Sequence, residues 1–493
     1  MISFWCLLLW ITTTLAFSNN GSSVQSNSTV NITSFSNVSS PFGYTNGNTS
    51  NSFHYRGVAL GGWLLLEPWI TPLLFNATIP ASGNTSEMAV DEYTFCQVLG
   101  KDEALKRLHN HWTTFYNESD IQDIKNYGFN MVRVPIGYWA FEMLPDDPYV
   151  PGAREYLDKV INWLHKYDLK VWIDVHGVPG SQNGFDNSGR FLNNTPGWQN
   201  STENIDLSHR VLRKIYTRYG SSEFYSQYGD TILGIEVVNE PMGPKLNMTQ
   251  VADFYEKSYK DARVYSDTNN TIVFHDAFQP AGYWDPFLNS TGSEPGRLKN
   301  YNILIDHHHY EVFSAGELNS TISTHLNNIR NYAMGIQREE QSHPAVVGEW
   351  SAALTDCTPW LNSVHFGTRW EGTFPYTNKP INNKYLGKCA NINNWDTWSK
   401  QHKRFTRKYI EMQLDQYESK MNGWIFWTYK TENSIEWDFK KLAKYELFPQ
   451  PFSKRQYIVD GVDTKPETGA SARLTPKDSV TVLMVMLLAV FLF

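Results

Sequence analysis

Two glutamates in this 493-residue chain follow apolar, β-branched segments. Glu240 lies in the sequence Val-Val-Asn-Glu-Pro at 237–241, and Glu349 lies in Val-Gly-Glu-Trp-Ser at 347–351. A carboxyl group at the end of a buried strand is held rigidly and stays reachable, as proton donation or attack on a carbon atom requires. Two such groups facing one cleft are the minimal equipment of a glycosidase. Either glutamate alone is compatible with an ordinary surface carboxylate, so the surrounding residues must decide.

The elements that would position these glutamates form a repeating pattern. Strand-like apolar segments alternate with segments of helical periodicity, as in repeated β-α units around a parallel sheet. Eight strands are predicted, at residues 56–63, 130–135, 170–175, 232–238, 271–275, 302–306, 345–348 and 423–427. Predicted helices between them include 154–167, 207–219, 251–265, 322–338 and 396–417. Eight such strands close into a barrel, so we expect one α/β domain, a (β/α)8 TIM barrel with long βα loops, over residues 55–459.

The ends of the predicted strands carry polar and aromatic side chains. In a barrel of this kind the active site lies at the carboxyl ends of the strands. The residues found there are Arg133, Asp174, His176, Asn239, Glu240, His307 to Tyr310, Glu349, Trp350 and Trp427. Each has a possible structural role, but packing alone does not explain why all of them gather at strand ends.

Longer motifs accompany these residues. They read RGV at 56–58, GGWLLLEP at 61–68, VRVPIGYW at 132–139, DVHG at 174–177, GSQNGFD at 180–186 and GWIFW at 423–427. With these motifs the chain closely resembles the fungal exo-β-1,3-glucanases of glycoside hydrolase family 5, over roughly residues 55–457. The Ser/Asn-rich leader and the apolar C-terminal end resemble the cell-surface-anchored members of that family.

The resemblance implies a retaining mechanism with Glu240 as general acid/base and Glu349 as nucleophile. Glu240 would have to remain protonated until it donates to the leaving oxygen, and Glu349 would have to be ionised to attack the anomeric carbon. The resemblance further implies that Arg133 holds Glu349 ionised. Asn239 would bond the sugar 2-hydroxyl, a contact that tightens in the transition state.

Substrate-binding roles are also implied by the resemblance. The residues concerned are Glu67, Arg133, His176, Phe185, Asn239, His308, Tyr310, Phe313 and Trp427. His308 is chosen over its neighbours by the family's His-x-Tyr spacing, because residues two apart on a strand face the same side. Phe185 and Phe313 match a pair of aromatic residues that grips the next glucose at the cleft entrance. Tyr429 stands where the family pattern has a second tryptophan.

Composition and charge exclude some classes of function. The formal net charge is −8, the pI is about 6.0, and no run of Lys or Arg occurs, so we expect no nucleic-acid partner. Aromatic residues make up 15% of the chain, which is typical of surfaces that stack on sugar rings as well as of Trp-rich cores. Zinc-ligand spacings of the CxxC or HExxH type are absent from the sequence, and we expect no metal, no cofactor and a monomeric protein. A competing interpretation takes Asp174, His176 and residues 307–309 as metal ligands.

Both ends of the chain indicate secretion. Residues 1–16 are predicted to be a signal peptide, and 17–54 a disordered, glycosylated leader rich in Ser and Asn. Residues 460–471 are predicted to be a stalk with a GPI attachment site at Gly469, Ala470 or Ser471, followed by a removed propeptide at 472–493. A single-pass tail anchor is the competing interpretation. We therefore expect a glycoprotein that is anchored at the plasma membrane or the cell wall.

Three cysteines remain after removal of the signal peptide. Cys357 and Cys389 flank one aromatic-rich segment and are the expected disulfide, which leaves Cys96 as a buried free thiol in a helix.

The sequence therefore predicts a retaining β-glucan hydrolase that acts on β-1,3 linkages from the non-reducing end, with glucosyl transfer to other glucans chemically available. A β-1,6-specific or endo-acting glucanase remains an alternative, because loop shape decides these properties. A cell-wall glycoprotein that binds glucan without cleaving it is the alternative from another class.

Overall fold

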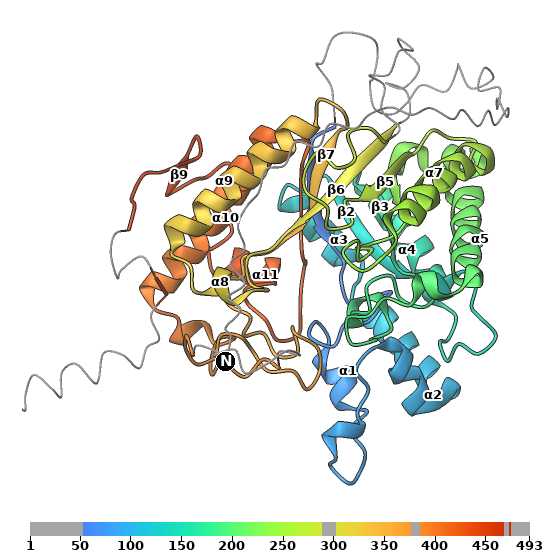
Figure 1. Ribbon diagram of the computed structural model, residues 1–493, viewed down its shortest axis with the longest axis horizontal. Helices are drawn as coiled ribbons and strands as arrows, with labels where there is room; N and C mark the ends of the chain where they lie inside the picture. Colours follow the sequence, from blue (N-terminus) through green and yellow to red (C-terminus); the bar gives the residue numbers. More distant parts are fainter. Residues whose placement is uncertain (1–52, 288–301, 376–384, 468–472, 475–493) are drawn as a thin grey trace, which may run out of the picture. The chain divides into compact units, whose positions relative to one another are not determined.

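The computed structural model describes residues 53–287, 302–375, 385–467 and 473–474, and its centre is a closed barrel of eight parallel strands in sequence order, β1 to β8 (Figure 1). The strands are β1 (Tyr55–Ala59), β2 (Met131–Gly137), β3 (Lys170–Gly177), β4 (Ile232–Glu236), β5 (Thr271–His275), β6 (Ile303–His309), β7 (Ala345–Trp350) and β8 (Gly423–Phe426). β1 pairs with both β2 and β8, which closes the ring. The predicted fold class is confirmed.

Helices surround the strands. They are α1 (Pro72–Asn76), α2 (Glu92–Thr114), α3 (Glu118–Asn126), α4 (Ala153–Lys166), α5 (Thr202–Tyr219), α6 (Ser222–Tyr228), α7 (Met248–Tyr265), α8 (Ala315–Leu318), α9 (Ile322–Glu339), α10 (Lys400–Lys420) and α11 (Phe439–Lys444). In Figure 1, α4, α5 and α7 lie on one side of the strands and α9 and α10 on the other. The five predicted helices correspond to α4, α5, α7, α9 and α10.

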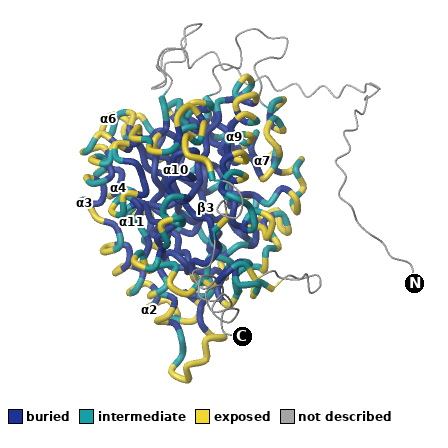
Figure 2. Tube along the Cα trace, turned by 90° about the vertical axis from the view of Figure 1, so that its left-hand side faces the viewer, coloured by how far each residue is buried: buried dark blue, intermediate teal, exposed yellow. Residues whose placement is uncertain are grey.

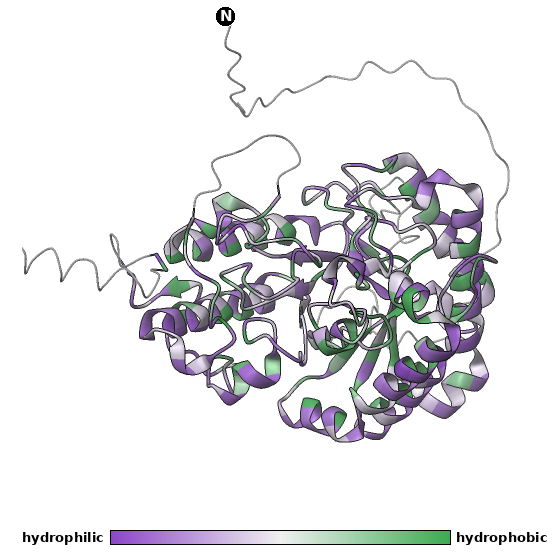
Figure 3. Ribbon diagram, turned by 90° about the horizontal axis from the view of Figure 1, so that it is seen from below, coloured by the Kyte–Doolittle hydropathy of each residue, from purple (hydrophilic) through white to green (hydrophobic). Residues whose placement is uncertain are grey.

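Apolar side chains of the strands and of the inner helix faces form the core. Buried residues lie along the strands and exposed ones on the outer helices (Figure 2), and the polar residues in Figure 3 lie mainly on the helices. α4 shows the cause, since Leu157, Val160, Ile161 and Leu164 recur at helical spacing and are all completely buried. This core holds the strand ends at fixed positions.

The strand boundaries differ from the prediction at several carboxyl ends. β1 ends at Ala59 rather than at residue 63, and the turn at Gly61 and Gly62 follows, in which Gly62 adopts a positive φ of 66°. β4 ends at Glu236, so Glu240 lies four residues beyond its strand, whereas β7 continues through Glu349 to Trp350. One predicted catalytic residue is thus on a loop and the other within a strand.

The disulfide between Cys357 and Cys389 is present, and Cys96 in α2 is a buried free thiol, as predicted. The disulfide closes the long segment that follows β7. Within that segment, the buried Asp356 carboxylate accepts backbone hydrogen bonds from Arg369 and Trp370 at 2.7 and 3.0 Å. The segment is therefore held at its base by a covalent bond and by a buried carboxylate.

The predicted boundary at residue 460 falls inside a small hairpin of β9 (Ile458–Val459) and β10 (Val462–Asp463). Residues beyond it contact α10, since Lys408 pairs with Asp463 at 2.9 Å and Arg404 with Glu467 at 2.7 Å. The described part of the predicted stalk therefore packs on the barrel domain.

The predicted signal peptide, almost all of the leader and the GPI attachment residues Gly469, Ala470 and Ser471 lie outside the described residues. So does the predicted propeptide except for Arg473 and Leu474, of which Arg473 donates a hydrogen bond to Asn319 at 3.1 Å. None of the described helices combines the length and the apolar character needed to span a bilayer.

Candidate active site

Arg133, near the middle of β2, is the centre of a buried charged group at the carboxyl ends of the strands. Its side chain is completely buried and contacts three carboxylates: Asp174 at 3.1 Å, Glu236 at 2.8 Å and Glu349 at 2.5 Å. It also donates a hydrogen bond to the side chain of Asn239 at 2.8 Å. One guanidinium, with its fixed fork of donors, thus holds side chains from β3, β4, β7 and the loop after β4.

The carboxylates around Arg133 differ in protonation. Burial opposes ionisation of Asp174, but the charges of Arg133 and His176 lower its pKa below the ordinary value. Burial raises the pKa of Glu236 well above its usual range, and the charge of Arg133 does not offset this rise. Asp174 is therefore the ionised partner of Arg133, and Glu236 is the member that keeps its proton. We call Arg133, Asp174 and Glu236 the base cluster.

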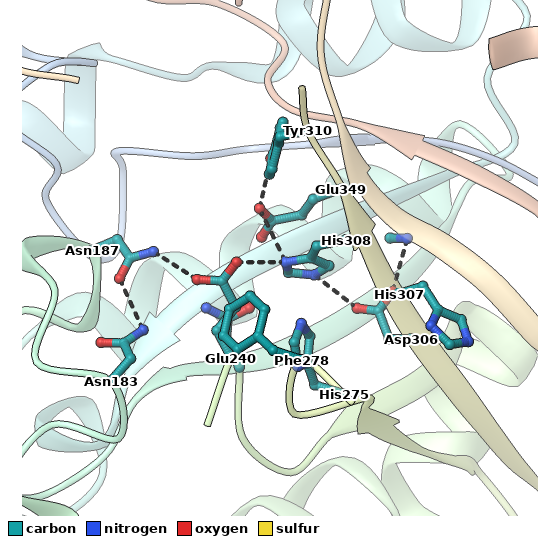
Figure 4. A network of polar contacts seen from close by, with 12 residues as sticks. Asn183, Asn187, Glu240, His275, Phe278, Asp306, His307, His308, Tyr310 and Glu349 are labelled. Carbon is teal, nitrogen blue, oxygen red and sulfur yellow. Dashed lines mark hydrogen bonds and ion pairs between the residues drawn. The ribbon is translucent and has the colours of Figure 1, made fainter. Parts of the chain in front are cut away.

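His308 lies between the two glutamates singled out in the sequence (Figure 4). Its Nδ1 atom is 2.8 Å from Oε1 of Glu240 and 3.4 Å from Oε2 of Glu349, while its Nε2 atom is 3.2 Å from Asp306. The other Glu240 oxygen accepts a hydrogen bond from Asn187 at 3.1 Å. Tyr310 donates a hydrogen bond to Oε2 of Glu349 at 2.8 Å.

The shared nitrogen limits the separation of the two glutamates. With 2.8 and 3.4 Å to His308 Nδ1, the two carboxylate oxygens lie at most about 6 Å apart. Retaining glycosidases hold their two carboxyl groups roughly 5–5.5 Å apart, and inverting enzymes hold them about 6.5–9.5 Å apart to leave room for a water molecule. The arrangement therefore fits the retaining geometry.

Burial and neighbouring charges shift the pKa values of Glu240, Glu349 and His308 in different directions. Burial favours the neutral acid of Glu240, yet the hydrogen bond and the charge of His308 lower its pKa to about 2. Burial raises the pKa of Glu349, and the charges of His308 and Arg133 offset this only in part. Burial alone would lower the pKa of His308, but the charges of Glu349 and Asp306 raise it well above the ordinary value. These pKa shifts favour a resting state in which His308 carries the proton, 2.8 Å from Glu240.

His176 and Asn239, two of the remaining predicted binding residues, lie beside Arg133 and Asp174. The Nδ1 atom of His176 lies 2.7 Å from Oδ2 of Asp174, which fixes the orientation of the ring. The His176 ring is stacked on Trp427 with centroids 5.3 Å apart. The Nδ2 atom of Asn239 lies 3.4 Å from Nε2 of His176. The structure thus brings Arg133, His176 and Asn239 into one hydrogen-bonded network.

A cavity of about 490 Å³ opens above the glutamates. Glu67 lines it, 3% exposed, with one oxygen bonded to the Trp69 indole at 2.9 Å and the other without a protein partner. Phe185, Phe313 and Trp427 also line it. Eight of the eleven residues predicted for catalysis or substrate binding therefore line the cavity, Arg133 and His176 contact lining residues, and Asn239 contacts Arg133 and His176.

Sequence reasoning missed several residues of the site. The cavity also contains Asn187, Phe278, Trp437 and Trp69, and Glu236 and Asp306 lie buried beneath it. Asn187 directly follows the motif at 180–186, so the motif itself pointed to it. Trp437 lies ten residues beyond Trp427 on the loop after β8, and no sequence pattern marks it.

Two groups of potential metal ligands occur among the described residues, namely Glu240 with His275 and His308, and Glu236 with Asp306 and His308. Both share His308, whose ring nitrogens already contact Glu240 and Asp306. Only His308 belongs to the ligand set considered in the sequence. His307 and His309 contact Asp276 and Tyr417 instead, away from the glutamates.

Comparison with known proteins agrees with this geometry. Residues 96–366 match the family profile "Cellulase (glycosyl hydrolase family 5)". The chain is 49% identical over 451 residues to glucan 1,3-beta-glucosidase 2 of Candida albicans, covering 89% of this chain and 91% of that protein. It is 46% identical over 409 residues to glucan 1,3-beta-glucosidase I/II of Saccharomyces cerevisiae, covering 82% and 86%.

Solved structures share the fold. The crystal structure of rutinosidase from Aspergillus niger superimposes with a TM-score of 0.56 at 19% identity, covering 80% of this chain and 98% of that one. The barrel, the carboxylate pair on β7 and after β4, and the family match over more than half of the chain together lead to one assignment. This chain belongs to glycosyl hydrolase family 5.

Proposed function

We propose that this chain is a retaining exo-β-1,3-glucanase that removes glucose from the non-reducing ends of cell-wall β-glucans. The observation that carries the proposal is the pair Glu240 and Glu349, held within about 6 Å of each other by His308 at the floor of an aromatic-lined cavity. The names of the relatives from Candida albicans and Saccharomyces cerevisiae support the β-1,3 linkage.

In the first step, Glu349 attacks the anomeric carbon while the glycosidic oxygen takes a proton from Glu240. Bond formation to Glu349 and bond breaking to the leaving sugar leave a glucosyl-enzyme ester. The proton that Glu240 delivers comes from His308, to which it is hydrogen-bonded at 2.8 Å. Loss of the Glu349 charge on glucosylation removes one cause of the raised His308 pKa, so proton transfer and ester formation favour each other.

In the second step, Glu240 takes a proton from water, and the oxygen of that water attacks the ester and restores Glu349. A sugar hydroxyl in place of water gives transglycosylation. Arg133 and Tyr310 contact Glu349 and stabilise the carboxylate that leaves. Asn239, held by Arg133, is the group assigned to the sugar 2-hydroxyl.

Proton NMR of laminarin digestion tests the proposal. The purified protein should release β-glucose first, without oligosaccharides. If α-glucose appears first, the nucleophile assignment of Glu349 is wrong. If pustulan, a β-1,6-glucan, is hydrolysed faster than laminarin, the linkage assignment is wrong.

A glucan-binding protein without activity is the second candidate, and one observation bears on it. Arg133, Glu236 and Asp174 are buried at 0% exposure, a costly arrangement that a binding surface does not require. No turnover by a folded sample that retains laminarin affinity would favour this candidate over the hydrolase.

We further propose that the protein is GPI-anchored at the cell surface through Gly469, Ala470 or Ser471. The small residues, the polar spacer and the apolar end at 480–493 support this. Treatment of expressing cells with a phosphatidylinositol-specific phospholipase C should release the protein, or alkali-resistant linkage to wall glucan should retain it. Release by detergent but not by the phospholipase would favour a tail anchor.

A further inference from the structure

The Glu92 side chain, in the first turn of α2, joins two of the loops that follow strands. One of its carboxyl oxygens accepts a hydrogen bond from the backbone N–H of Leu66, after β1, at 2.8 Å. The other oxygen accepts a hydrogen bond from the indole N–H of Trp139, after β2, also at 2.8 Å. Glu92 is 1% exposed, so both bonds form out of contact with water. The carboxyl group therefore fixes the backbone at Leu66 relative to the Trp139 ring.

The Trp139 indole is itself held in one position. It is stacked on Tyr149 with ring centroids 4.0 Å apart and an interplanar angle of 3°. A Cβ atom at Gly137 or at Gly189 would lie 2.3 Å or 2.2 Å from the indole, so the ring fills space that only glycine leaves free at these positions. Trp139 is thus a rigid reference point for Glu92.

The first turn of α2 is also bonded to the loop after β3. The backbone N–H of Tyr93 donates a hydrogen bond to the carbonyl of Gly189 at 2.9 Å. The buried carboxylate of Asp91 accepts a hydrogen bond from the backbone N–H of Phe191. Asp91 is at the same time the N-cap of α2, since it accepts a hydrogen bond from the backbone N–H of Thr94 at 2.6 Å. The end of the helix that carries Glu92 is therefore fixed to the barrel loops on both sides.

Leu66, which Glu92 holds, directly precedes Glu67 in the lining of the sugar cavity. Neither Leu66 nor Glu67 belongs to a helix or a strand. One carboxyl oxygen of Glu67 accepts a hydrogen bond from the Trp69 indole at 2.9 Å, and the other has no hydrogen-bond partner among the described residues. The position of the Glu67 side chain therefore depends on the backbone that carries it, and the bond from Leu66 to Glu92 ties this backbone to α2.

We propose that Glu92 is a positioning residue that places the Glu67 carboxyl group in the sugar cavity. Glu92 does not line the cavity itself and acts through the backbone at Leu66. The inference rests on the proposed hydrolase function. A carboxyl group can accept hydrogen bonds at both oxygens, whereas the amide of glutamine accepts at one atom and donates at the other. Glu92→Gln must therefore turn an N–H toward the N–H of Leu66 or of Trp139, and the loss of either bond releases one end of the link.

A double-mutant cycle between Glu92 and Glu67 tests the proposal. The four proteins are wild type, Glu92→Gln, Glu67→Ala and the double variant, and kcat/KM is measured on laminaritriose. In the wild-type background Glu92→Gln should lower kcat/KM about tenfold, because Glu67 no longer meets the sugar in the correct position. In the Glu67→Ala background the same change should lower kcat/KM less than about twofold, because the group that Glu92 positions is already absent. A merely structural role of Glu92 would lower kcat/KM by the same factor in both backgrounds.

Glu411→Gln is the matched control. Glu411 is a completely buried carboxyl group of α10 that accepts hydrogen bonds from the backbone N–H groups of Tyr457 and Ile458 at 2.8 and 3.0 Å, as Glu92 does from Leu66. None of these three residues lines the cavity. The control should lower the melting temperature, as Glu92→Gln does, but should leave kcat/KM within about twofold of wild type.

Equal losses of kcat/KM in the two backgrounds overturn the proposal, and so does an unchanged kcat/KM in folded Glu92→Gln. If Glu92→Gln does not fold, Glu92→Asp carries the same cycle, because it keeps both acceptor oxygens but withdraws them by one methylene group. If wild type does not hydrolyse laminaritriose, the proposed function fails, and the crystal structure of the Glu92 variant then decides. A displaced Glu67 carboxyl group in that structure supports the positioning role, and an unmoved one overturns it.

Discussion

The base cluster and the aromatic rim of the cavity, which includes Phe278 and Phe313, differ in charge, in burial and in what they contribute to the protein. The base cluster is charged, fully buried and bonded across strands, with Arg133 contacting Asp174 and Glu236. The rim is apolar and partly exposed, as Phe278 and Phe313 show. Charge in a low-dielectric interior must be paired, so the residues of the base cluster tolerate few substitutions. The rim only has to present ring faces, so its residues affect binding more than folding.

The largest expected effect is the loss of activity when Glu349 is replaced. Glu349 contacts Arg133 of the base cluster and also lines the cavity. Glu349→Gln removes the nucleophile, and steady-state kinetics on laminarin should show kcat lower by about 10⁴-fold or more. The melting temperature should stay close to that of wild type, because glutamine can still accept hydrogen bonds from Arg133 and Tyr310. Activity within tenfold of wild type would remove Glu349 from the nucleophile role.

Arg133→Met should damage both activity and stability, because it leaves buried carboxylates without a counter-charge. Breaking a buried ion pair of this kind costs about 3–5 kcal/mol, and chemical denaturation should show a loss of this size in the free energy of unfolding. Arg133→Lys is the matched control, since it keeps the charge but not the fork of donors, and its loss should be smaller. Equal stability of Arg133→Met and wild type would contradict the account of the base cluster.

His308→Asn should change the pH dependence of kcat/KM. In wild type the charges of Glu349 and Asp306 raise the pKa of His308 well above the ordinary value, which favours a proton on His308, so activity should persist into the alkaline range before it falls. Without the imidazole, Glu240 itself must hold the proton. Burial raises the pKa of Glu240, but to a lower value than the surrounding charges give His308 in wild type. The alkaline limb of the profile should therefore move to lower pH, together with a fall in kcat of about 10²-fold. An unchanged alkaline limb would exclude His308 as the proton store.

Phe313→Ala should weaken substrate binding without affecting stability, in contrast to substitutions in the base cluster. The ring is 42% exposed and packs against Tyr310 and Trp437 at 5.7 and 6.3 Å. Loss of a stacking surface should raise KM for laminaritriose by about tenfold, with kcat and melting temperature nearly unchanged. A drop in kcat with constant KM would place Phe313 in the chemical step.

His307→Gln should have the smallest effect on activity, because His307 lies on the outer side of β6. Burial opposes its charge, but contacts with Asp276 at 2.8 Å and Glu339 at 3.4 Å raise its pKa to about 10. A raised pKa stabilises the fold fully below the unfolded pKa of about 6.5, and the contribution is lost as pH rises toward 10. Denaturation between pH 6.5 and 10 should show a steeper loss of stability in wild type than in the variant.

Much of the site was predictable because strand ends are visible in sequence. Arg133, Asp174 and Glu349 stand near the ends of short apolar runs, and a barrel brings such ends together. The spacing of His308 and Tyr310 predicted a shared face, and both side chains do contact Glu349. Asn187, Phe278 and Trp437 were not predictable in this way, because they lie on loops whose course no periodicity describes.

The sequence by itself determined the barrel, the two carboxylates and the disulfide, because each depends on local patterns and on the closed order of parallel strands. Only the tertiary structure decided the pKa of His308, since it depends on burial and on the charges of Glu349 and Asp306 around the ring. It also decided that Phe191, on the loop after β3, meets Phe366, on the loop after β7. Residues 175 positions apart in the chain make that contact, and only the packing of two long loops on a rigid barrel brings them together.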